Sequence, residues 1–288
     1  MPPGSLTRVP DGLLVYQALW AMEQLVEPEA GLREKFDRVK AAGFDGMAID
    51  LGALSFAEAR QTIPEFTRTG LHAGLTAFPQ SVEDLRPALQ LAREINAPFV
   101  VVIGQQMPLE LEAMIRTIRG WHAVAEEEGM PIQFETHRNC ITNDLYTTVQ
   151  LLEAIPEMRI SADLSHYVVE REMPCPVTPW LRQLITRVLQ RADSFQGRIA
   201  SRSQIQIPLH FPQSQQWIEL FHRWWLEGFS LWRARHAREQ ASLVFICELG
   251  PPDYAITDAN GVELSNRWDE ALTLAQWARE LWTSSHRE

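Results

Sequence analysis

The chain has 288 residues, of which 45% are hydrophobic and 22% charged, and its formal net charge at pH 7 is −11. This composition is typical of a soluble globular protein, and the length suits one α/β barrel of about 250 residues. The negative charge argues against nucleic acid as a ligand, because binding a polyanion draws on clustered Lys and Arg.

The sequence also bears on compartment and redox chemistry. It holds no apolar run of about 18 residues that would span a bilayer, and residues 1–5 lack the basic and apolar regions of a signal peptide. We therefore expect a cytoplasmic protein with no membrane partner. The three cysteines, Cys140, Cys175 and Cys247, are too irregularly spaced for a zinc cluster or a disulfide framework, and we predict free thiols.

Short apolar runs rich in β-branched residues alternate with longer segments of helical spacing along the whole chain. This alternation indicates βα units and predicts a single (β/α)8 TIM barrel spanning residues 1–288. We expect strands near residues 13–17, 46–50, 71–77, 99–103, 132–136, 159–163, 198–203 and 243–248. We expect helices over residues 31–42, 56–69, 82–95, 109–128, 145–155, 180–192, 216–237 and 268–282.

An acid ends three of the predicted strands, namely Glu135, Asp163 and Glu248. In a (β/α)8 barrel such strand ends converge at the C-terminal mouth, where these barrels carry out chemistry. Three carboxylates form an oxygen-rich site suited to Mn²⁺, Mg²⁺ or Co²⁺. The ion would polarise a hydroxyl–carbonyl pair and stabilise an enediolate, while a carboxylate moves the proton. For any single acid the alternative is a helix N-cap or a loop salt bridge.

Histidines and aromatic residues follow the same strand ends. His137 lies two residues past Glu135, on the same side if the strand continues. His166 follows Asp163 by three residues, so we expect it in the loop above the acid, where it could bind substrate or a second metal; the alternative is a solvent-exposed histidine. Trp20 and Tyr254 offer aromatic walls for a sugar-like ligand. The sequence contains no Walker motif, nucleophile elbow or dinucleotide glycine fingerprint.

Three motifs carry a family resemblance: Glu135-Thr136-His137-Arg138, Asp163-Leu164-Ser165-His166 and Glu248-Leu249-Gly250-Pro251-Pro252. In this order they resemble the sugar phosphate isomerase/epimerase superfamily of xylose-isomerase-like TIM barrels. The resemblance implies a metal held by a Glu, an Asp, a His and a final Glu, and it places three of these ligands on Glu135, Asp163 and Glu248. For an isomerase or epimerase of this kind, we expect Glu135 and Glu248 to act as both ligands and bases, and His137, His166 and Arg202 to hold the substrate.

The third ligand of that pattern is missing. The resemblance leads us to expect a His-x-His-x-Arg strand, and this chain reads Arg198-Ile199-Ala200-Ser201-Arg202, so Ala200 takes the place of the ligand. Losing a neutral ligand predicts weak metal binding or none. His210 or Gln204 could supply a replacement, or Arg198 could replace the charge of the metal by forming salt bridges with the acids.

Three functions remain open at this stage. The first is a metal-dependent isomerase or epimerase acting on a small sugar, polyol or keto-sugar (phosphate) through an enediolate. The second is a non-catalytic relative that binds a small ligand or a partner protein through the same mouth. The third is a dehydratase acting on a similar polyol. A homo-oligomer is compatible with each of them.

Overall fold

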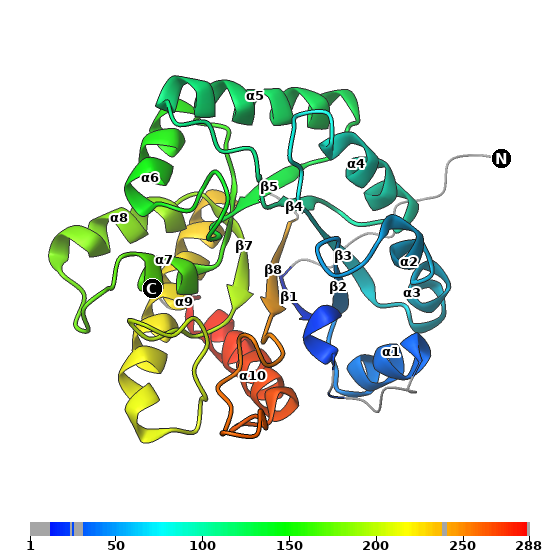
Figure 1. Ribbon diagram of the computed structural model, residues 1–288, viewed down its shortest axis with the longest axis vertical. Coiled ribbons are helices and arrows are strands. Elements are labelled where there is room, and N and C mark those ends of the chain that lie inside the picture. The colour runs from blue at the N-terminus through cyan, green and yellow to red at the C-terminus, as the bar shows by residue number, and fades with distance from the viewer. Residues whose placement is uncertain (1–11, 24, 26–30, 238–240, 287–288) are drawn as a thin grey trace.

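The computed structural model describes residues 12–23, 25, 31–237 and 241–286. Within this part of the chain, eight parallel strands pair in sequence order and close into a barrel, with β8 hydrogen-bonded to β1. Helices surround the barrel (Figure 1). The predicted (β/α)8 TIM barrel is confirmed. The strands are β1 (Gly12–Ala18), β2 (Gly46–Asp50), β3 (His72–Ala77), β4 (Val100–Val102), β5 (Ile132–Glu135), β6 (Ile160–Ala162), β7 (Ala192–Gly197) and β8 (Ser242–Cys247).

The surrounding helices agree with the predicted ones except at two places. The segment 56–69 is broken into two helices because Pro64, which has no N–H, lies in the first turn of a new helix after Thr62. A short helix that we did not predict begins directly after β6 and is N-capped by Asp163. The helices are α1 (Leu32–Ala41), α2 (Phe56–Arg60), α3 (Ile63–Thr69), α4 (Leu85–Glu94), α5 (Leu111–Glu127), α6 (Leu145–Ala154), α7 (Leu164–Glu170), α8 (Pro179–Leu189), α9 (Gln215–Arg235) and α10 (Arg267–Ser284).

The prediction of the seventh strand at residues 198–203 is wrong. The strand β7 lies earlier in the sequence, and residues 198–200 follow it without strand structure. The reason is that the inner face of β7 is polar: Ser194 and Gln196 are buried and bond to side chains of β5 and β6. This segment therefore lacks the apolar alternation that identifies most strands. The apolar pair Ile199 and Ala200 gave the false signal instead.

Two apolar layers position the strands. Inside the barrel, β1 and β8 contribute Tyr16 and Ile246 to a small core. Tyr16 fits there only because residue 46 is glycine, since a Cβ at that position would lie 2.5 Å from the tyrosine ring. A larger core packs the outer faces of the strands against the helices, and it includes Trp224 and Trp225 of α9.

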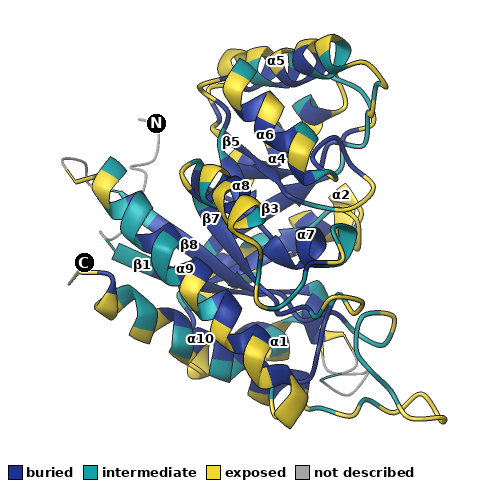
Figure 2. Ribbon diagram, turned by 90° about the vertical axis from the view of Figure 1, so that its left-hand side faces the viewer, coloured by how far each residue is buried: buried dark blue, intermediate teal, exposed yellow. Residues whose placement is uncertain are grey.

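Burial follows this layering. The strands at the centre are buried almost throughout, and the helices carry their exposed residues on the outward side (Figure 2). The alternation along β8 places Ile246 inside the barrel and Cys247 in the outer core, so the next residue, Glu248, faces inward again. None of the described helices combines the length and the hydrophobicity needed to cross a membrane.

Candidate active site at the barrel mouth

The three predicted acids converge at one end of the barrel. Glu135 is the last residue of β5, and Asp163 and Glu248 directly follow β6 and β8. One carboxylate oxygen from each lies within 4.8 Å of the others. They meet because parallel strands of a closed barrel bring their C-terminal ends to the same rim. Glu135 and Asp163 are 1% and 0% exposed, whereas Glu248 is 9% exposed. Glu248 is therefore the most accessible of the three.

Asp163 has partners at both carboxylate oxygens. As the N-cap of α7, it accepts bonds at Oδ1 from the backbone N–H of Ser165 at 2.9 Å and from the Ser165 hydroxyl. The Asp163 Oδ2 atom accepts a 2.7 Å bond from Nη2 of Arg198. The helix N-cap that was the alternative for a single acid is thus observed at Asp163, in addition to its place in the acid cluster.

Arg198 is the cation of this cluster and is completely buried. The register pairs Gly197 with Cys247, so Arg198 and Glu248 continue side by side past the ends of β7 and β8. Nη2 of Arg198 lies 3.3 Å from Oε2 of Glu248 as well as 2.7 Å from Asp163. The expected alternative, in which Arg198 forms salt bridges with the acids, is what the structure contains. Nε and Nη1 of Arg198 are buried without a hydrogen-bond partner among the described residues.

Glu135 is satisfied at one oxygen only. Its Oε2 accepts a 3.1 Å bond from the side-chain amide of Gln196 on β7, and its buried Oε1 has no partner in the described part of the chain. Burial, followed by repulsion from Glu248 and Asp163, raises the pKa of Glu135 well above its usual range. Glu135 therefore holds a carboxylate oxygen free inside the cluster.

The other two acids differ in ionisation. Burial raises the pKa of Glu248 to about 7, despite the opposing charge of Arg198. Burial alone would also raise the pKa of Asp163, but Arg198 and His166 outweigh burial and hold that pKa well below its usual range. Asp163 is thus the fixed anion of the cluster, whereas Glu248 is suited to exchange a proton near neutral pH.

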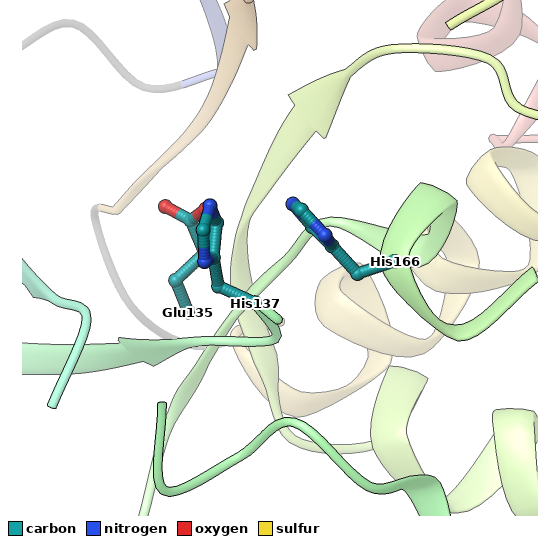
Figure 3. A group of neighbouring side chains, drawn as sticks. All are labelled: Glu135, His137 and His166. Carbon is teal, nitrogen blue, oxygen red and sulfur yellow. The ribbon is translucent and has the colours of Figure 1, made fainter. Parts of the chain in front are cut away.

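His137 and His166 lie beside Glu135 (Figure 3). Their ring centroids are 4.1 Å apart, and one ring nitrogen from each lies within 4.8 Å of a Glu135 oxygen. His166 is not in an exposed loop: it lies in the first turn of α7 and is 2% exposed. Burial lowers the pKa of His166, and burial with the nearby His166 lowers the pKa of His137 to about 3. Both rings are therefore neutral at pH 7.

Aromatic and basic side chains border the cluster, as predicted for Trp20 and Tyr254. The two rings meet edge to face with centroids 5.5 Å apart, and the Trp20 side chain opposes the rise in the pKa of Glu248. The guanidinium carbons of Arg138 and Arg198 each lie 4.9 Å from the centre of the Tyr254 ring. Tyr254 therefore stands against the buried Arg198, and Trp20 stands against the most accessible acid.

Four other residues singled out from the sequence lie elsewhere. Arg202 has a side chain 58% exposed and pairs with Glu172. His210 is exposed and lies 3.7 Å from Glu270, and Gln204 closes a tight turn with Ser201. Ala200 is buried in the segment after β7, beyond the strand. The inward side chains nearest the acids on this side are instead Gln196 and Arg198.

Sequence reasoning missed Asp50 as a member of this group. It is the last residue of β2, and burial raises its pKa to about 6. Its negative charge also contributes to the raised pKa values of Glu135 and Glu248. The signal was present, because Asp50 ends a correctly predicted strand in the same way as the three acids that were identified.

A divalent ion shared by Glu135, Asp163 and Glu248 does not fit this arrangement. Both oxygens of Asp163 are engaged, and Nη2 of Arg198 is directed at Asp163 and Glu248. A second cation between the same two carboxylates would meet the guanidinium charge at close range. Oε1 of Glu135 and Oε2 of Glu248 accept no hydrogen bond from the described residues, but Oε2 of Glu248 faces Nη2 of Arg198 at 3.3 Å. The acids as arranged therefore hold Arg198 in the position that the family resemblance gave to a metal.

Comparison with known proteins identifies the fold. No protein-family model matches the chain, and no curated protein sequence matches it. Among solved structures, a xylose isomerase-like TIM barrel protein from Mycobacterium smegmatis in complex with magnesium has a TM-score of 0.59 at 13% identity, covering 97% of this chain and 100% of that chain. D-allulose 3-epimerase from Methylomonas sp. has a TM-score of 0.54 at 15% identity, covering 96% and 99%. The probable 3-DHS dehydratase AsbF from Bacillus anthracis has a TM-score of 0.53 at 13% identity, covering 82% and 92%. The chain therefore has the xylose-isomerase-like TIM-barrel fold.

Proposed function

We propose that the protein is an isomerase or epimerase of a small sugar, polyol or keto-sugar, with or without a phosphate, and that it works through an enediolate. The observation that carries this proposal is the pairing of Glu248 with Arg198 at the barrel mouth: the least buried of the three carboxylates, 9% exposed, lies beside a fully buried guanidinium with two unpartnered donors. The similarity in fold to a D-allulose 3-epimerase supports the same class of reaction.

Each residue has a chemical task in this proposal. Glu248 removes the proton from the carbon next to a carbonyl, since its pKa near 7 suits a group that must accept and return a proton. The free Nε and Nη1 of Arg198 donate hydrogen bonds to the oxygen that becomes negative in the enediolate. Trp20 and Tyr254 hold the apolar face of the sugar ring or chain. Return of the proton to the neighbouring carbon gives isomerisation. Epimerisation needs a proton delivered to the opposite face of the same carbon, and Glu135 is the second acid assigned to deliver it, while Glu248 keeps the proton that it removed.

The test is proton exchange, because it detects the enediolate before the product is known. The protein is incubated in D2O with a panel of ketoses, aldoses and their phosphates, and deuterium incorporation next to the carbonyl is followed by NMR. We expect Glu248→Gln to lower the exchange rate by about 10²–10⁴-fold, the usual contribution of a general base. Glu172→Gln is the matched control, since Glu172 is 74% exposed and pairs only with Arg202 among the described residues. Full activity in both Glu248→Gln and Glu135→Gln would refute the proposal.

A second candidate is a non-catalytic relative that binds a small ligand, and the observation that favours it is the ion pairing of Arg198 with two of the acids. Such a protein would bind a panel member in a calorimetric titration and would exchange no deuterium into it. A dehydratase would exchange deuterium and release water, so mass analysis of the product separates it from an isomerase.

A further inference from the structure

We propose that Glu135, His137 and His166 form a binding site for a divalent transition-metal ion, in place of the three-acid site. One ligand atom from each of these residues lies within 4.8 Å of the other two. Figure 3 shows the carboxylate of Glu135 and the two imidazole rings turned toward one another, from the end of β5, the segment after it and α7. Only Glu135 is shared with the acid cluster around Arg198.

Unpartnered buried atoms point to a ligand at this place. Nδ1 of His166 and Oε1 of Glu135 are buried with no hydrogen-bond partner among the described residues, and Nε2 of His166 has only the carboxylate of Asp163 beside it, at 3.3 Å. Polar atoms left without a partner in the interior lose the hydrogen bonds that they make to water in the unfolded chain, so such atoms are rare unless something binds them. His166 is 2% exposed and Glu135 is 1% exposed, so bulk water does not offer the missing bonds. A metal ion would accept the lone pairs of both groups.

Each histidine also has an acceptor beside it. Nδ1 of His137 lies against the backbone carbonyl oxygen of Arg138. An N–H donated there leaves the lone pair on Nε2, as in histidines whose second nitrogen binds a metal. Nε2 of His166 lies 3.3 Å from Oδ2 of Asp163, so a carboxylate stands next to that ring. A metal-binding histidine usually has such a partner to fix its orientation.

The charge of the cluster favours a divalent ion. With all groups ionised, Glu135, Asp163, Glu248 and the neighbouring Asp50 contribute −4 and Arg198 contributes +1, which leaves −3 at the mouth. One divalent ion offsets two of these charges. Arg198 occupies the side of the cluster between Asp163 and Glu248, so the open position lies on the side of the histidines. Two imidazoles with one carboxylate favour Zn²⁺, Co²⁺, Fe²⁺ or Mn²⁺ over Mg²⁺ and Ca²⁺, which prefer oxygen ligands.

The experiment is metal titration of the full chain after removal of bound ions with a chelator. Zn²⁺ binding is followed by calorimetry, and Co²⁺ binding by its visible absorption, which reports nitrogen ligands. We expect one ion per chain in the wild type and affinity lower by a factor of about 10 or more in His166→Gln and in His137→Gln, because changes even to groups behind a ligand cost that much. Glu248→Gln separates the two sites: the proposed site keeps its affinity in this variant, and a three-acid site loses it.

His210→Gln is the matched histidine control, since His210 is exposed and lies outside the cluster. Thermal melts show whether each variant is folded. His137 is only half-buried, so we expect His137→Gln to disturb folding less than His166→Gln does. Two results would overturn the proposal: no ion bound by the folded wild type, or equal loss of affinity in Glu248→Gln and the histidine variants. Metal binding is read without a substrate, so its failure is distinct from a failure of the proposed isomerase function.

Discussion

The ion pair at Arg198 makes a strong prediction about stability. Replacing Arg198 by Met keeps much of the side-chain volume and removes the charge, which leaves Asp163 buried without its cation. Breaking a buried ion pair by removing one partner costs about 3–5 kcal/mol. Arg198 and Asp163 are both 0% exposed, so neither water nor movement of the loop replaces the 2.7 Å bond. Glu248 is 9% exposed and recovers part of its hydration, so most of the cost falls on Asp163.

Thermal and urea unfolding near pH 7 measure this cost. For a chain of this size, 3–5 kcal/mol corresponds to a decrease in Tm of roughly 6–15 °C. Arg202→Met is the control, because its partner pair is exposed and such pairs contribute about 0–1 kcal/mol. The double variant Arg198→Met, Asp163→Asn should regain more than half of the loss, since Asn still accepts the N-cap bond from the backbone of Ser165.

Two outcomes would refute this reasoning. One is an Arg198→Met protein within about 1 kcal/mol of the wild type, which would mean that the guanidinium does not carry the energy of the pair. The other is a double variant no more stable than the single one, which would mean that the loss comes from the cavity and the packing of the Arg198 side chain and not from the unpaired acid.

Three further predictions concern acid stability, the barrel interior and the thiols. The pKa of Asp163 is lower in the folded protein than in the unfolded chain, where it is about 4, so ionised Asp163 stabilises the fold above that pH. This stabilisation is lost as pH falls and Asp163 takes up a proton. In urea melts, the stability difference between wild type and Asp163→Asn should therefore shrink between about pH 5 and pH 2, and a constant difference would contradict the prediction. Gly46→Ala places a methyl group 2.5 Å from the Tyr16 ring and 2.6 Å from the carbonyl oxygen of His72, so we expect the free energy of unfolding to fall by about 1–3 kcal/mol. Gly31→Ala is the control and should change little, because its Cβ meets nothing within 4 Å. Equal melting temperatures of the two variants would refute the overpacking argument. Cys175 should react with a thiol reagent in the native protein, while Cys140 and Cys247, which are buried with raised pKa values, should react only on unfolding. Rapid reaction of all three thiols in the native protein would disprove this.

The convergence of the acids was predictable because one rule of topology governs it. Parallel strands of a closed barrel end at the same rim, so an acid at the end of a strand must lie near the acids of its neighbours. Glu135, Asp163 and Glu248 obey that rule from the sequence alone. Asp50 obeys it too, and it was overlooked because no motif around it resembled a family pattern. The strand-end rule therefore identifies all four acids, whereas the family motifs identify only three of them.

The parts that failed depend on polarity inside the barrel and on local capping. The strand β7 carries Ser194 and Gln196 on its inner face, where hydrogen bonds to β5 and β6 replace apolar packing, and no periodicity in the sequence reveals those bonds. The error moved the expected site to Arg202, which is exposed. His166 was expected in a loop, but the carboxylate of Asp163 caps a helix at that point and draws the histidine into the interior.

The misplaced strand also concealed why Arg198 matters. Once β7 ends at Gly197, its alternation makes Gln196 and Arg198 consecutive inward residues, and the register sets Arg198 beside Glu248. The guanidinium is thus built into the rim by the fold, and it offsets one of the four negative charges that Glu135, Asp163, Glu248 and Asp50 carry when ionised. The remaining −3 is lowered either by protons on the acids or by a divalent ion. Protons leave Nδ1 of His166 without a partner, whereas an ion at Glu135 and the two histidines satisfies a buried imidazole nitrogen and lowers the charge at the same time. The excess charge and the unpaired imidazole therefore have a common solution, and metal titration of the histidine variants tests it directly.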